Sequence, residues 1–227
     1  MNKMRRIFEK ELDDLHTQFM RMGILVNESF HNAIDAFINH DKELSQKVIE
    51  DDIEINQCEA QLEQACFELI ALQQPVTTDL RKIVTVMKAS ADLERIGDHA
   101  VSMAKATISV KGNKHNIDIE TKIALAADKV STMLQEVLDA YVIFDADAAY
   151  KIAKKDMEID ALTKEIYEAI VEEMKRDPDI ILGGSHYMRI ALYIERIGDY
   201  ITNICEWIIY LNSGKIVELN THNYIEE

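Results

Sequence analysis

The sequence feature that most constrains the fold is a five-residue segment, Glu-Arg-Ile-Gly-Asp, that occurs twice. It occupies residues 94–98 and again residues 195–199, with the two copies 101 positions apart. Each copy lies in a long stretch whose apolar residues recur at helical spacing, so each is expected to belong to an amphipathic helix. A period near 100 residues is too long for a solenoid repeat. It indicates that a whole helical domain has been duplicated.

The rest of the chain supports a duplicated three-helix unit. Apolar periodicity predicts helices at about residues 4–39, 41–74 and 80–110, and again at about 118–144, 145–175 and 185–212. Residues 52–56 match residues 156–160 at an offset of 104, so the middle helices of the two halves also align. Two prolines and seven glycines favour long uninterrupted helices. We therefore predict an all-α protein of two tandem three-helix bundles, with six long helices and domains at residues 1–112 and 113–227.

Composition excludes several classes of function. A net charge of −16 argues against nucleic acid as the main partner, because phosphate binding needs clustered Lys and Arg. No apolar run approaches the roughly 20 residues that span a bilayer. The three cysteines, Cys58, Cys66 and Cys205, form no CxxC pair and are expected to be buried free thiols of a cytoplasmic protein. No phosphate-binding loop, nucleophile elbow or Cys–His pair is present, so we expect no enzymatic activity.

The glycine of each repeated segment is expected to serve packing. Gly97 and Gly198 fall on the apolar stripe of their helices, where a missing side chain lets a neighbouring helix approach closely. A glycine inside a helix costs about 1 kcal/mol relative to alanine, so close packing is a reason for its presence.

The acids of each segment are candidate metal ligands. Glutamate and aspartate at positions i and i+4 share one helix face, and two carboxylates one turn apart can hold a hard cation if a further oxygen ligand arrives from another helix. The middle helices offer that ligand, because Asp52 and Asp156 interrupt apolar stripes where an unpaired carboxylate is costly. The candidate metal ligands are Asp52, Asn56, Glu94 and Asp98 in the first half and Asp156, Asp160, Glu195 and Asp199 in the second.

Two alternatives use other residues. Arg95 and Arg196 could instead pair with these acids and hold the register of the bundle. Glu28 and His31 form an E-x-x-H pair, the spacing found in ferritin-like di-iron bundles, but no second copy exists. This single pair is the basis of the alternative function, a ferritin-like metal-dependent enzyme or metal-storage bundle.

Several motifs together resemble the PhoU family of phosphate-transport regulators, over nearly the whole chain. The motifs are Met20-Arg21-Met22-Gly23, Gln74-Pro75 followed by Asp79-Leu80-Arg81, residues 93–98, residues 194–199 and Asn203-Ile204-Cys205-Glu206. This resemblance implies two three-helix bundles and multinuclear clusters of iron or zinc. The implied ligands are Glu94, Asp98, Glu195, Asp199, Asp156 and Asp160, with Asp52 matching and Asn56 replacing an acid.

The resemblance also implies a function and partners. A member of this family is expected to be a cytoplasmic negative regulator of phosphate uptake and of phosphate-starvation signalling. It would act as an adaptor between a phosphate ABC transporter and a membrane sensor histidine kinase, meeting the membrane only through them, and it would form a homodimer. Trp207, Ile208 and Ile209 could pack inside the bundle or against a second copy.

Overall fold

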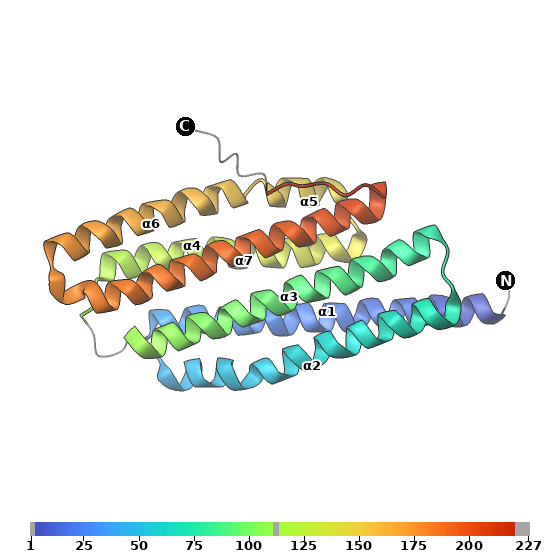
Figure 1. Ribbon diagram of the computed structural model, residues 1–227, viewed down its shortest axis with the longest axis horizontal. Helices are drawn as coiled ribbons and strands as arrows, with labels where there is room; N and C mark the ends of the chain where they lie inside the picture. The colour runs from blue at the N-terminus through green and yellow to red at the C-terminus, as the bar shows by residue number, and fades with distance from the viewer. Residues whose placement is uncertain (1–2, 111–113, 221–227) are drawn as a thin grey trace.

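The computed structural model describes residues 3–110 and 114–220, and this part of the chain is built of helices without strands (Figure 1). The first half holds α1 (Lys3–Ile38), α2 (Lys42–Gln73) and α3 (Thr77–Val110). The second half holds α4 (Ile117–Ile143), α5 (Ala146–Ala153), α6 (Asp156–Arg176), the short 3-10 helix η1 (Pro178–Ile180) and α7 (Ile181–Ser213). The all-α, duplicated three-helix architecture predicted from the sequence is confirmed.

Polar residues define where several helices begin. The carboxylate of Asp41 accepts hydrogen bonds from the first amide groups of α2, and the side chain of Asn116 does the same for α4. These side chains satisfy donors that a helix N-terminus otherwise leaves without partners. At the other end, α1 and α4 are followed by residues in the left-handed conformation, His40 with φ 51° and Phe144 with φ 54°. Each therefore turns the chain sharply into the next helix.

Some predicted helix limits were wrong. The helix expected at 145–175 is interrupted after Ala153, and α6 begins at Asp156. The ammonium group of Lys155, within the break, contacts the Glu136 carboxylate of α4 at 2.5 Å. Residues 183–184, expected to form a loose connection, lie buried in the first turns of α7 instead. A Cβ on Gly184 would meet Met174 and Ile170 of α6, so tertiary packing outweighs the low helix propensity of glycine there.

The two halves pack together through their first and third helices. α3 and α7 lie side by side and run antiparallel in the middle of the molecule (Figure 1). Asp92 of α3 accepts hydrogen bonds from Trp207 Nε1 at 2.9 Å and from Asn203 Nδ2 at 3.2 Å. Later in α3, His99 stacks on Tyr193, which lies earlier in α7, with 5.5 Å between the ring centroids. α1 also packs against α4, again antiparallel, with His16 contacting Tyr141 and Asn27 contacting Gln135. One continuous apolar core thus runs through both halves.

The side chains at the end of α7 belong to this core. Ile208 and Ile209 are buried, and Trp207 is half-buried against Asp92, so all three pack within the molecule. Cys66 and Cys205 are buried free thiols as predicted, while Cys58 is half-buried. Among the described helices, none combines the length and the apolar character needed to cross a membrane.

The last described residues return along α7. The amide of Leu219 donates to Glu206 Oε1 at 2.6 Å, and Val217 and Leu219 pack against the core. Residues 221–227 lie outside the described part of the chain. Residues 111–113 do so as well, and the predicted domain boundary between residues 112 and 113 falls among them. The domain limits therefore stay a prediction.

Candidate metal centre

Both repeated segments face an aspartate of the middle helix through their glycine. The Oδ1 atom of Asp52 on α2 lies 3.5 Å from the position that a Cβ on Gly97 would occupy. The Oδ1 atom of Asp156 on α6 lies still closer to Gly198, within 3.0 Å of the corresponding position. Each glycine therefore leaves room for a carboxylate, in addition to allowing close approach of the helices. The predicted opposition of the two helix types is present once in each half.

In the first half, Asp52 is only partly satisfied. Its Oδ2 atom accepts a hydrogen bond from Asn56 Nδ2 at 2.9 Å, while its Oδ1 atom is buried without a hydrogen-bond partner among the described residues. On α3, Arg95 contacts both acids of its own segment, Asp98 at 3.2 Å and Glu94 at 3.7 Å. These contacts lie within one helix, so Arg95 does not hold the register between helices.

The electrostatics of the first half favour a bound cation. Burial raises the pKa of Asp52. The hydrogen bond from Asn56 lowers this pKa in part, and the negative charge of Asp98 raises it again. Burial and then the charge of Asp98 also raise the pKa of Glu94. Burial and the charge of Asp98 therefore both disfavour the charged forms of Asp52 and Glu94, and a cation held among these carboxylates would offset that cost. The orphaned Oδ1 atom of Asp52 and these acids have the chemistry of a metal ligand set, but the carboxylates of Asp52, Glu94 and Asp98 do not bring one oxygen each within 4.8 Å of one another in this structure.

In the second half, the aspartate is buried more deeply. Asp156 is 4% exposed and sits in the first turn of α6, where the helix dipole favours a negative charge. Asp160 follows one turn later, and Glu195 and Asp199 lie half-buried on α7. The side-chain amide of Asn220 approaches the backbone oxygen of Asp199 at 3.3 Å and its Oδ1 atom at 3.4 Å.

Asn220 is a residue of this site that no sequence pattern indicated. It lies in a segment without apolar periodicity, and its contact with Asp199 depends on how that segment returns along α7. The internal repeat could not indicate Asn220 either, because the first half has no segment after its third helix that matches the one holding Asn220. In the first site, Asn56, which stands where the second half has Asp160, is exposed.

The E-x-x-H pair lies elsewhere. His31 and Glu28 are exposed on α1, and His31 Nε2 lies 3.5 Å from Asp35 of the same helix. Ligands of a ferritin-like di-iron centre project into the bundle core, which these side chains do not. This placement disfavours the ferritin-like alternative.

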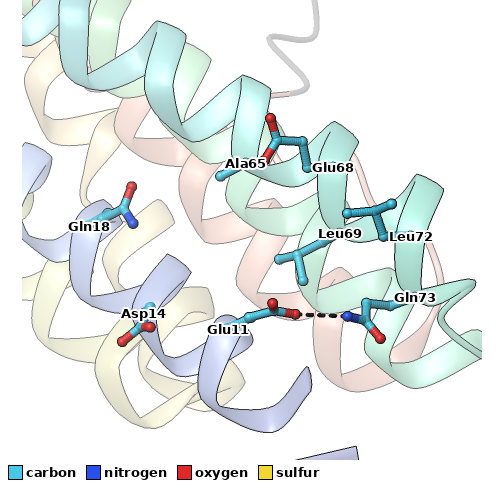
Figure 2. Close-up of a pocket in the computed structure, with 8 residues that line it drawn as sticks. All are labelled: Glu11, Asp14, Gln18, Ala65, Glu68, Leu69, Leu72 and Gln73. Carbon is cyan, nitrogen blue, oxygen red and sulfur yellow. Dashed lines mark hydrogen bonds between the residues drawn. The ribbon is translucent and has the colours of Figure 1, made fainter. Parts of the chain in front are cut away.

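A groove between α1 and α2 contains none of the predicted ligands. Figure 2 shows its lining side chains, with Gln73 Nε2 donating to Glu11 across the groove at 3.0 Å. Three acids, Glu11, Asp14 and Glu68, border it without a facing basic side chain. On α2 its lining begins at Ala65, more than two helical turns beyond Asn56, so the groove is separate from the candidate metal centre.

The fold and the site together define a class of protein: a duplicated helical bundle in which each half sets a glycine-containing acidic helix against a second acidic helix. The family model described as the PhoU domain matches two stretches of the chain, residues 19–107 and 123–208. The chain therefore belongs to the PhoU family, as the sequence motifs indicated.

Individual relatives cover nearly the whole chain. A Clostridium acetobutylicum protein named as a phosphate-specific transport system accessory protein PhoU homolog is 38% identical over 95% of this chain and 99% of its own length. The Escherichia coli phosphate-specific transport system accessory protein PhoU is 34% identical over 92% of this chain and 86% of its own length. A crystal structure of the phosphate transport system regulatory protein PhoU from Streptococcus pneumoniae superposes with a TM-score of 0.88, at 35% identity, over 93% of this chain and 99% of that one.

Proposed function

We propose that this protein is an accessory regulator of phosphate transport that lowers phosphate uptake and phosphate-starvation signalling when phosphate is plentiful. Membership of the PhoU family supports the regulatory role, since the relatives are named as accessory proteins of the phosphate-specific transport system. Such names describe regulators and not enzymes, in agreement with the expectation from the sequence. As an adaptor, the protein would connect a phosphate ABC transporter to a membrane sensor histidine kinase in the cytoplasm, as a homodimer.

We further propose that the duplicated acidic sites hold divalent or trivalent metal ions, iron or zinc, in the working protein. The observation that carries this proposal is the repeated placement of a carboxylate against a helix glycine, Asp52 at Gly97 and Asp156 at Gly198. In the first half the ion would be held by Asp52, Glu94 and Asp98, with Asn56 as a neutral ligand. In the second half Asp156, Asp160, Glu195 and Asp199 would hold it.

A bound metal ion would supply positive charge to a surface that is otherwise acidic. The chain itself carries a net charge of −16, which repels a phosphate group or an acidic partner segment. With cations held at the acidic sites of α3 and α7, the surface around these sites could bind an anionic group. The rigid helices would fix where that group docks.

Metal analysis of the purified protein tests the site. We expect wild-type protein to carry iron or zinc and the Glu195→Ala/Asp199→Ala variant to lose the second-half share of it. The matched control is Glu168→Ala/Glu172→Ala, which removes two exposed acids at the same spacing on α6. Equal metal contents in the wild type and the Glu195→Ala/Asp199→Ala variant would contradict the proposed site.

The regulatory role is tested in cells. Deleting the gene should raise phosphate uptake and starvation-gene expression in phosphate-rich medium, and wild-type protein should restore both. If uptake and expression stay at wild-type levels in the deletion strain, the regulatory proposal fails. Turnover by the metal-loaded protein in a redox or phosphatase assay would overturn the adaptor role in favour of an enzyme.

A further inference from the structure

Two histidines and one glutamate meet where the two halves of the chain join. His40 follows α1, His115 lies in the segment before α4, and Glu120 lies in the first turn of α4. One ligand atom from each lies within 4.8 Å of the others, and no other group of three such side chains is this compact among the described residues. We propose that this junction cluster, His40, His115 and Glu120, is a zinc site.

The distances in the junction cluster suit a tetrahedral ion. His115 Nδ1 lies 3.0 Å from Glu120 Oε1, and His40 Nε2 lies 3.4 Å from Glu120 Oε2. Zinc–nitrogen and zinc–oxygen bonds of about 2.0–2.1 Å at tetrahedral angles place neighbouring ligand atoms about 3.3 Å apart. The two separations, each to a different oxygen of the Glu120 carboxylate, lie close to that value. Two imidazoles and one carboxylate are also a ligand set that zinc uses with a fourth position open.

The carboxylate of Glu120 is held by a buried tyrosine. The hydroxyl group of Tyr187, whose side chain is fully buried on α7, donates to Glu120 Oε1 at 2.5 Å and accepts a hydrogen bond from the Asn116 amide at 3.3 Å. The ring of Tyr187 packs edge-on against Phe37 of α1. Tyr187 thereby fixes one oxygen of the carboxylate and leaves Oε2 facing His40. Such an outer hydrogen bond is typical of metal-ligating carboxylates.

The two histidines are already placed for an ion. Their ring centroids are 4.3 Å apart, and the Nδ1 atom of His40 is buried without a hydrogen-bond partner among the described residues. Its Nε2 atom is the one turned toward the carboxylate, 3.4 Å from Glu120 Oε2. His40 reaches this position with a φ of 51°, a backbone conformation that costs a non-glycine residue free energy. Two like charges this close would repel, whereas two neutral imidazoles can share one cation.

A zinc ion there would connect the two halves directly. One ligand comes from the end of the first helix of the first half and two from the start of the second half. Because the unfolded chain does not hold these residues together, ion binding would stabilise the folded arrangement. This site is separate from the acidic sites of α3 and α7 and does not depend on the proposed function.

Zinc titration of the metal-free full-length protein tests the proposal. The Glu195→Ala/Asp199→Ala background removes the second acidic site, so calorimetry with Zn²⁺ measures the first acidic site and the junction cluster together, and the junction cluster is identified by the difference that His115→Ala makes. We expect His115→Ala to lose one equivalent of bound zinc, and His31→Ala, which removes an exposed histidine of α1, to keep it. Because His115 is exposed before α4, its replacement should leave the helical circular dichroism signal unchanged.

Two further measurements make the test specific. Tyr187→Phe should weaken zinc binding by about 10- to 100-fold while keeping the stoichiometry, as loss of an outer hydrogen bond does at other metal sites. Co²⁺ added in place of zinc should give the visible absorption of a tetrahedral, nitrogen-ligated ion, and this absorption should vanish in His115→Ala. Zinc binding of unchanged stoichiometry and affinity in folded His115→Ala would overturn the proposal.

Discussion

Replacing Gly198 with alanine tests the packing of the second repeated segment. Alanine is favoured over glycine inside a helix by about 1 kcal/mol. However, the added Cβ would lie within 3.0 Å of Asp156 Oδ1, and ordinary contact begins at 3.4 Å. The buried carboxylate must move by about 1 Å, and overpacking of this kind costs about 1–3 kcal/mol. We therefore expect a net loss of about 1 kcal/mol in the free energy of unfolding.

The first repeated segment provides the matched control. A Cβ on Gly97 would meet Ile55 at 3.3 Å and Asp52 at 3.5 Å, which requires a shift of only a few tenths of an ångström. Gly97→Ala should therefore be neutral or slightly stabilising. Thermal unfolding followed by circular dichroism should separate the two variants by at least about 2–4 °C, since about 1 kcal/mol shifts Tm by this amount in a chain of this size.

A double-mutant cycle with Asp156→Ala identifies the cause. If the contact with the carboxylate is responsible, Gly198→Ala should become stabilising in the Asp156→Ala background, with a coupling free energy of about 1–3 kcal/mol. Equal effects of Gly198→Ala in both backgrounds, or equal effects of Gly97→Ala and Gly198→Ala in the wild type, would refute this explanation of the glycine.

Three other changes test interactions that stabilise the fold. Burial lowers the pKa of His16 from 6.5 to about 4. Between these pH values the unfolded chain binds more protons than the folded one, so the free energy of unfolding should fall by about 3 kcal/mol in total as the pH drops from 6.5 to about 4. His16→Gln should flatten this part of the pH–stability curve and the exposed control His31→Gln should not; a curve unchanged by His16→Gln would contradict the assignment. Asp41→Ala removes the cap of α2 and should cost about 1 kcal/mol in urea unfolding, whereas no loss would mean that the cap contributes nothing. Trp207→Phe leaves the half-buried carboxylate of Asp92 without one of its two donors and should cost about 1 kcal/mol, and an Asp92→Asn background should shrink that loss.

The helices and their duplication could be predicted because they rest on local properties. Apolar spacing marks an amphipathic helix wherever it occurs, and the in-register recurrence of Glu-Arg-Ile-Gly-Asp marks equivalent helices. The same helical arithmetic placed Gly97 and Gly198 on the core face, where both are buried. The acidic interruptions at Asp52 and Asp156 were visible as well, but their close approach to Gly97 and Gly198 was seen only in the structure.

The break between α5 and α6 could not be predicted in this way. Residues 154–155 are both lysines, so neither glycine nor proline marks the interruption, and the contact of Lys155 with Glu136 of α4 exists only after the helices have packed. The opposite error occurred at residues 183–184, where two glycines signalled a loop. There the close approach of α6 keeps Gly184 inside a helix.

The sequence by itself determined the helical class and the duplication, because periodicity and internal repetition report local structure; the acids it singled out as metal ligands stay a prediction. Only the tertiary structure decided how the halves meet. It runs α3 antiparallel to α7, brings Asn220 to Asp199, and unites His40 with His115 and Glu120. These contacts join residues far apart in the chain, and their geometry follows from packing that no local pattern encodes.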